Sequence, residues 1–111
     1  MTISFDDFLK VDVRVGRIVA AREFPGARKP AFQLEIEFGQ ETGRRRSSAQ
    51  LTQRYTAEQL VGLQVMAVVN FPPRQIANFF SEVLVLGVPD ADGNVVLVRP
   101  DAEVPLGGRL Y

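Results

Sequence analysis

Hydrophobic and polar residues alternate in two long segments of the first half of the chain, and this period of two predicts β-strands. Residues 11–24 form the first predicted strand, which Gly16 interrupts and where we expect a bend. Residues 31–38 form the second predicted strand and show the clearest alternation. Four apolar side chains point to one face (Phe32, Leu34, Ile36 and Phe38), and Gln33, Glu35 and Glu37 point to the other.

The later strands are predicted by apolar runs between turn residues. Residues 44–50 follow a turn and are expected to return antiparallel to the second strand. Residues 64–70 contain a β-branched run that the pair Pro72-Pro73 brings to an end, and residues 81–88 form a similar run. The turn-rich segment 89–94 then leads into a short apolar segment, which predicts a hairpin.

Capping residues predict two short helices. Thr56 and Gln59 form a capping box at the start of residues 56–62, which end in a glycine. Ser4 is a suitable N-cap for a helix at the beginning of the chain, where Phe5, Phe8 and Leu9 form one apolar stripe. This stripe needs a partner surface, either on the same domain or on another subunit.

The order of these elements predicts an all-β fold. Five strands with a short helix between the third and fourth are the plan of an OB-fold barrel. A short N-terminal helix precedes this barrel, and the turn-rich residues 99–111 form a C-terminal extension. The pattern alone leaves an SH3-like barrel or an open sandwich as alternatives.

Length and composition indicate a small globular protein. The chain has 111 residues, of which 46% are hydrophobic and 23% charged, so we expect a single domain over residues 1–111. No window approaches the roughly 18–20 apolar residues that span a membrane. The acidic N-terminal segment also lacks the apolar run of a secretory signal. We therefore expect a cytoplasmic protein that does not insert into membranes.

The chain contains no cysteine and no histidine, which removes several classes of chemistry. Thiolate nucleophiles, imidazole bases and the commonest metal ligands are excluded. No spacing pairs two carboxylates across a cleft. We therefore expect a binding protein rather than an enzyme, with no cofactor and no metal site.

Basic residues gather in the middle of the chain although the formal net charge is zero. Residues 24–54 hold six of them (Arg28, Lys29, Arg44, Arg45, Arg46 and Arg54) against three acidic residues. OB barrels bind ligands on strands two and three and on the loops beside them, which here are residues 24–30 and 71–80. The second loop offers Arg74 together with Phe71, Phe79 and Phe80.

This combination of arginine and aromatic side chains suits two kinds of ligand. Single-stranded nucleic acid gains about 1–3 kcal/mol for each base stacked on an aromatic ring. A peptide would use the phenylalanines as an apolar slot and Arg74 to bind a carboxylate or carbonyl group. Glu35 and Glu37 argue against nucleic-acid binding, because they lie on the strand face where a phosphate backbone would run and would repel it. Phe79 and Phe80, each taken singly, are better explained as core residues than as platforms for a ligand.

Several blocks of the sequence resemble the CsaA-type export-related chaperones. They are VDVRVG at 11–16, ARKPAF at 27–32, SSAQLT at 47–52, NFPPRQI at 70–76 and SEVLVLGVP at 81–89. That family is part of a wider group of OB-fold tRNA-binding domains, which occur as free proteins and as appendages of aminoacyl-tRNA synthetases. The resemblance implies a homodimer formed through the terminal extensions. It also implies binding of unfolded or pre-export polypeptides, in a cavity near residues 71–80, on their way to the Sec translocase.

The predicted site residues follow from this loop and from the resemblance. Eight residues are expected to bind peptide: Phe32, Ser48, Gln50, Asn70, Phe71, Arg74, Gln75 and Ser81. The alternative tRNA site would use Arg28, Lys29, Arg44, Arg45, Arg46 and Arg74. The wider tRNA-binding group usually carries Ser-Gly where Ala49-Gln50 stands, and Glu82 adds a negative charge, so we expect weaker tRNA binding here.

Overall fold

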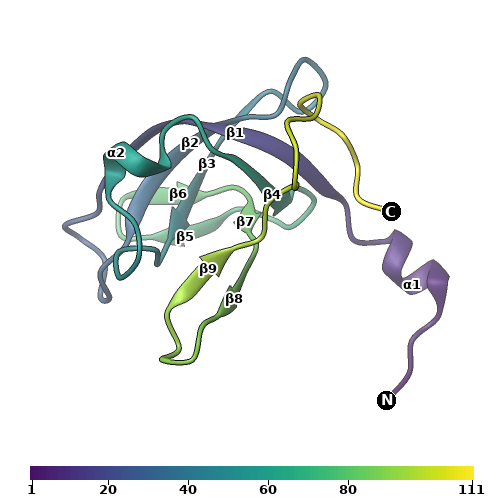
Figure 1. Cartoon of the computed structure of the whole chain (residues 1–111), viewed down its shortest axis with the longest axis horizontal. Coiled ribbons are helices and arrows are strands. Elements are labelled where there is room, and N and C mark those ends of the chain that lie inside the picture. Colours follow the sequence, from purple (N-terminus) through teal and green to yellow (C-terminus); the bar gives the residue numbers. More distant parts are fainter.

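The structure is a computed structural model that describes residues 1–111 (Figure 1). Its helices are α1 (Phe5–Leu9) and α2 (Ala57–Leu60). Its strands are β1 (Val13–Glu23), β2 (Phe32–Glu37), β3 (Arg44–Ala49), β4 (Gln64–Val68), β5 (Arg74–Ile76), β6 (Phe79–Ser81), β7 (Leu84–Val85), β8 (Gly87–Pro89) and β9 (Val95–Leu97). No helix is long and apolar enough to cross a membrane.

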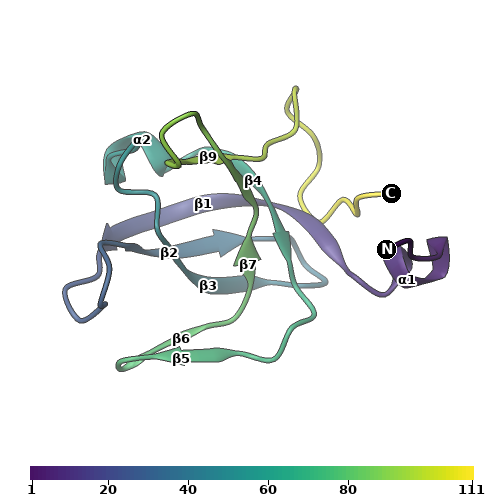
Figure 2. The same cartoon turned by 90° about the horizontal axis from the view of Figure 1, so that it is seen from below.

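The main sheet has five antiparallel strands in the order β3-β2-β1-β4-β7 and curls into a nearly closed barrel (Figure 2). The helix α2 lies between β3 and β4 in the chain, as the OB-fold plan requires. Its capping box, Thr56 with Gln59, is present as predicted. The predicted OB-fold barrel is therefore confirmed, against the SH3-like barrel and the open sandwich.

The long strand β1 allows the sheet to curl because its two halves pair with different strands. Residues 13–17 pair with β4, and residues 17–23 pair with β2. Gly16 lies at this crossing, where an added Cβ would stand 2.5 Å from Ile36 Cγ2 and 2.7 Å from Phe38 Cε1. A side chain has no room there, so the glycine is required by the close approach of β2 and its extension.

The core fills the barrel with the apolar face of β2. Leu34, Ile36 and Phe38 are almost completely buried, while the polar residues between them are only partly buried. Leu60 of α2 and Val65 of β4 belong to the same core cluster and are fully buried. The alternation predicted for residues 31–38 is thus confirmed.

Two predicted segments differ from the structure. Residues 71–80, expected to be a connecting loop, contain the hairpin β5–β6, in which Arg74 lies opposite Ser81 and Ile76 opposite Phe79. Residues 81–88, expected to be one strand, are divided among β6, β7 and β8. The first break begins at Glu82, whose backbone N–H donates to the Arg46 carbonyl oxygen of β3 at 2.8 Å. The second break is at Leu86, whose carbonyl oxygen accepts from the Val98 N–H at 3.1 Å.

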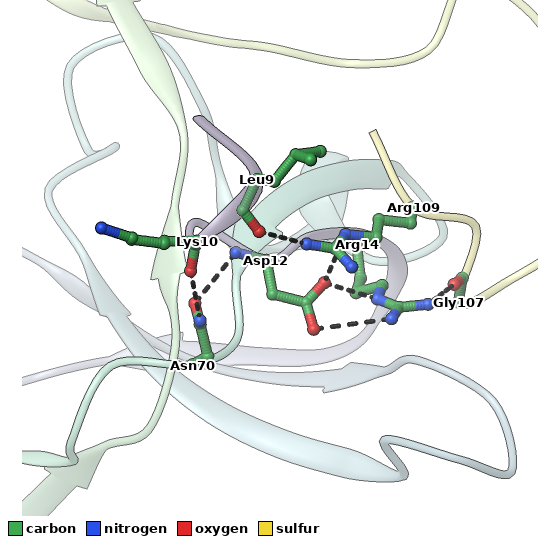
Figure 3. Close-up of polar contacts among 7 residues, drawn as sticks. All are labelled: Leu9, Lys10, Asp12, Arg14, Asn70, Gly107 and Arg109. Atoms are coloured by element: carbon green, nitrogen blue, oxygen red, sulfur yellow. Dashed lines mark hydrogen bonds and ion pairs between the residues drawn. The ribbon is translucent and has the colours of Figure 1, made fainter. Parts of the chain in front are cut away.

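The terminal segments are tied to the barrel by a polar network around Asp12 (Figure 3). Its carboxylate accepts a hydrogen bond from Arg14 Nε at 2.7 Å and lies 3.5 Å from Arg109 Nε. Arg109 in turn donates to the Leu9 carbonyl oxygen at 2.7 Å, which joins the C-terminal segment to the end of α1. The hydrogen bond with Asp12 raises the pKa of Arg14 above its usual value.

Candidate functional site

A cavity of about 590 Å³ opens where the barrel is least closed. Four segments line it: the end of β3 with residues 50–51, residues 71–76 of the hairpin region, residues 81–87, and Val95 of β9. Most of the lining side chains are apolar. Concave, largely apolar surfaces with a few polar groups are typical of ligand-binding sites.

Five of the eight predicted peptide-binding residues line this cavity. They are Ser48, Gln50, Phe71, Arg74 and Ser81. They come from three segments that are distant in the sequence, and the barrel brings them together. The structure therefore gathers most of the predicted set around one hollow.

The other three predicted residues lie outside the cavity. Phe32 is buried in the barrel core. Asn70 accepts a hydrogen bond from the Asp12 N–H at 3.0 Å and donates to the Lys10 carbonyl oxygen at 2.8 Å, so it fastens the N-terminal segment (Figure 3). Gln75 is exposed on the opposite face of the hairpin from Arg74 and Ile76.

Arg74 is the one basic side chain in the cavity lining. It forms no ion pair and no side-chain hydrogen bond within the chain, and it is exposed. Pro72 and Pro73 precede it and restrict the backbone that carries it. Phe71, at the cavity wall, is 51% exposed. Together they present a free guanidinium group beside an accessible aromatic ring.

The two neighbouring phenylalanines have different roles. Phe79 is buried and packs edge-on against Phe24, with ring centroids 5.4 Å apart. The Arg46 guanidinium lies 5.2 Å from the centroid of the Phe79 ring. Phe80 points from the opposite face of the hairpin and is 46% exposed. Phe79 thus belongs to a small core cluster, and only Phe80 remains at the surface.

The residues predicted for a tRNA site do not form one cluster of free charges. Arg44 pairs with Glu37 at 3.5 Å, and Arg46 pairs with Glu82 at 3.7 Å. Arg45 donates to the Thr42 carbonyl oxygen. Arg28 and Lys29 are exposed without an ion pair in the loop between β1 and β2.

Sequence reasoning missed several residues of the cavity wall. Ile76, Leu84 and Leu86 line it and supply much of its apolar surface. Ile76 lies two residues from Arg74, but the three residues of β5 are too few to show an alternation. Leu84 and Leu86 carried no signal, because their segment was expected to be one continuous buried strand. No three acidic side chains gather in a way that could hold a metal ion.

Comparisons with known proteins identify the family. A family model described as "Putative tRNA binding domain" matches residues 13–109. The chain belongs to this family. Within this tRNA-binding-domain family it resembles the crystal structure of the chaperone CsaA from Bacillus anthracis, with 53% identity, full coverage of both chains and a TM-score of 0.92. The CsaA chaperone protein from Picrophilus torridus is 48% identical, with 99% of this chain and 100% of that one covered and a TM-score of 0.92.

The family also includes parts of larger proteins. The methionine–tRNA ligase of Porphyromonas gingivalis is 37% identical over 108 residues. This match takes in 97% of the chain but 15% of the ligase, so the chain spans about one seventh of the length of that relative. The resemblance to CsaA-type chaperones seen in the sequence is thus confirmed. The similarity to the ligase is limited to one part of it, a tRNA-binding domain.

Proposed function

We propose that this protein is a homodimeric, chaperone-like protein that binds unfolded or pre-export polypeptides in the cytoplasm and assists their transfer to the Sec translocase. The observation that carries the proposal is the mostly apolar cavity whose single basic side chain, Arg74, has no partner within the chain. The similarity to two CsaA chaperone structures over nearly their whole length supports it.

The charge around the cavity favours polypeptide over polyanion. Glu82 lines the cavity and compensates Arg46, so the local excess of positive charge is limited to Arg74. A single guanidinium group can bind one carboxylate or a peptide carbonyl. The apolar wall, including Phe71 and Ile76, then contributes by removing apolar side chains of the ligand from water.

The test is a binding titration of a fluorescent, permanently unfolded protein such as reduced and carboxymethylated lactalbumin. We expect Arg74→Ala and Phe71→Ala each to weaken binding roughly tenfold, the loss of about 1.4 kcal/mol. Arg99→Ala is the matched control, because Arg99 is also exposed and unpaired but lies outside the cavity. Circular dichroism and thermal unfolding would check that the variants keep the fold. Unchanged affinity in both cavity variants would rule out this site.

tRNA binding is the second candidate function, and the family match over residues 13–109 favours it. Arg28, Lys29 and Arg74 are the predicted contacts that form neither an ion pair nor a side-chain hydrogen bond within the chain. A titration with tRNA at increasing salt would detect such binding. The logarithm of the binding constant falls linearly with the logarithm of the salt concentration, with a slope of about −0.7 to −0.9 for each phosphate neutralised. A flat salt response would exclude it.

A further inference from the structure

One edge of β7 is left without a partner strand, because β7 is the last strand of the five-stranded sheet. Val85 lies directly across from Ala67 of β4, and the Leu86 N–H donates to the Met66 carbonyl oxygen at 2.9 Å. Hydrogen-bonded and non-hydrogen-bonded pairs alternate along an antiparallel ladder. Leu84 and the Leu86 N–H therefore face β4, and the Leu86 carbonyl oxygen accepts from the Val98 N–H at 3.1 Å. Val85 directs its N–H and C=O away from β4. On that side β3, the other edge strand of the sheet, faces β7 across the opening of the barrel without pairing with it.

The strand β3 forms the other edge of the sheet, and it is joined to the β6–β7 segment at one end only. The Arg46 N–H donates to Glu82 Oε1 at 2.9 Å, and the Ser48 N–H donates to Ser81 Oγ at 3.0 Å. Beyond Ser48, no hydrogen bond connects residues 49–51 with residues 84–87. We call this open stretch the seam. Both of its sides line the cavity.

We infer that the polypeptide binds in an extended conformation and enters the seam as an added strand, paired with the free backbone groups of Val85. This inference rests on the proposed function and specifies what the site recognises. Strand addition to an exposed sheet edge is a recurring mode of peptide recognition, in which backbone hydrogen bonds supply affinity that does not depend on sequence. Exposed edges also pair readily with other chains when nothing covers them.

The side chains around the seam favour particular side chains in the bound polypeptide. Alternate residues of a bound strand point to the same side, so every second side chain would meet the apolar wall of Phe71, Ile76 and Leu84. Arg74 is the uncompensated charge of the cavity and would bind an acidic side chain or a terminal carboxylate. The preferred ligand is thus an extended segment with apolar residues at alternate positions and a nearby acidic group.

Folded proteins offer few such segments, because the great majority of their backbone groups are already paired. Recognition through the backbone therefore distinguishes unfolded from folded chains without reading a particular sequence. Nucleic acid has no equivalent pattern of amide donors and carbonyl acceptors at this spacing, so it does not fit the free edge of β7.

The test uses a fluorescein-labelled peptide of seven residues that alternates valine and serine and ends in glutamate. The glutamate fixes the register through Arg74. The peptide is compared with single N-methyl variants at each position, which remove one backbone donor and leave the side chain. We expect a loss of roughly tenfold at the one central position whose N–H donates to the Val85 carbonyl oxygen, and changes below about twofold at the other positions. Equal tolerance of N-methylation at every position would overturn the inference.

Amide hydrogen exchange of the protein, followed by NMR, gives an independent readout. The Val85 amide is expected to exchange quickly in the free protein and slowly in the peptide complex, whereas the Leu86 amide is protected in both because it already bonds to Met66. Peptide binding without any protection of Val85 would overturn strand addition and leave the proposed function standing. Absence of binding by the unmodified peptide and by the unfolded protein would overturn both.

Discussion

The Glu82 side chain has two partners, and both belong to one arginine. Its carboxylate accepts the Arg46 backbone N–H at 2.9 Å and lies 3.7 Å from the guanidinium Nε of the same residue. Glu35 and Glu37 act similarly on the outer face of β2, where they pair with Arg22 and Arg44. Exposed ion pairs of this kind add little stability. Their larger effect is to lower the positive potential of the surface that would face a phosphate backbone.

We predict that Glu82→Gln increases tRNA binding. Glutamine keeps an oxygen acceptor for the Arg46 N–H, so the edge of β3 stays capped while one negative charge is removed. The affinity for tRNA should rise severalfold at low salt. The slope of log K against the logarithm of the salt concentration should become steeper by about 0.7–0.9 for each added phosphate contact. Filter binding at several salt concentrations would measure both.

The control for this experiment is Glu58→Gln, which removes the same charge from an exposed, unpaired residue of α2. It should leave the salt dependence unchanged. Equal effects of the two substitutions would mean that net charge alone matters and that Glu82 has no specific role.

At the scale of elements, the sequence predicted the barrel well because its strands carry strong alternation. Leu34 and Ile36 are buried where the pattern requires, and α2 begins at the predicted capping box. A bend was expected at Gly16, but the irregularity of β1 lies between Ile18 and Ala20, and Gly16 instead makes room for the close approach of Ile36 and Phe38. The strands with a clear alternation and the helix with a capping box could thus be predicted from local patterns alone.

The hairpin β5–β6 could not be predicted in the same way. Its strands have three residues each, too few to show a period. Its turn places Ala77 at φ = 53°, a conformation for which glycine or asparagine is the usual signal. Ser81 and Glu82 likewise act on β3 through contacts between residues more than thirty positions apart, which no local pattern encodes.

The difference between local patterns and contacts of distant residues also explains how much of the candidate site was predicted. Phe71 and Arg74 stand out because prolines and aromatic residues cluster around them, and both line the cavity. Asn70 stands in the same cluster, but its side chain is used to hold the N-terminal segment. The role of the exposed side chains stays a prediction, whereas their positions around the hollow are now described.

At the scale of the whole molecule, the terminal segments leave apolar side chains uncovered. The exposed set, which we call the terminal surface, consists of Ile3, Phe5, Leu9, Leu110 and Tyr111. The helix α1 buries none of its residues, and it lies on the same side of the barrel as the C-terminal segment (Figure 1). The hydrogen bond from Arg109 to Leu9 joins the two segments. An exposed apolar group of this kind is typical of an interface.

We predict that the terminal surface forms the contact of a twofold homodimer, in which the same residues of both chains meet. The double variant Phe5→Ser/Leu110→Ser removes apolar area from both segments, worth about 25 cal/mol for each Å² buried, and should shift the protein toward monomer in sedimentation equilibrium. Val88→Ser is the control, since Val88 is 53% exposed but lies on the β8–β9 hairpin. A monomeric parent protein at micromolar concentration would contradict the prediction.

A dimer with two cavities should bind a long unfolded chain more tightly than a short peptide, and this difference tests whether the dimer contributes to binding. A short peptide occupies one cavity, so its affinity should be the same for the parent protein and the double variant. A long unfolded chain can occupy both cavities of a dimer, and such linkage can raise avidity by about 10²–10⁴-fold when the connecting segment spans the two sites. The double variant should therefore lose affinity for the unfolded protein but keep it for the short peptide. Parallel losses for both ligands would instead indicate that the substitutions damage the cavity itself.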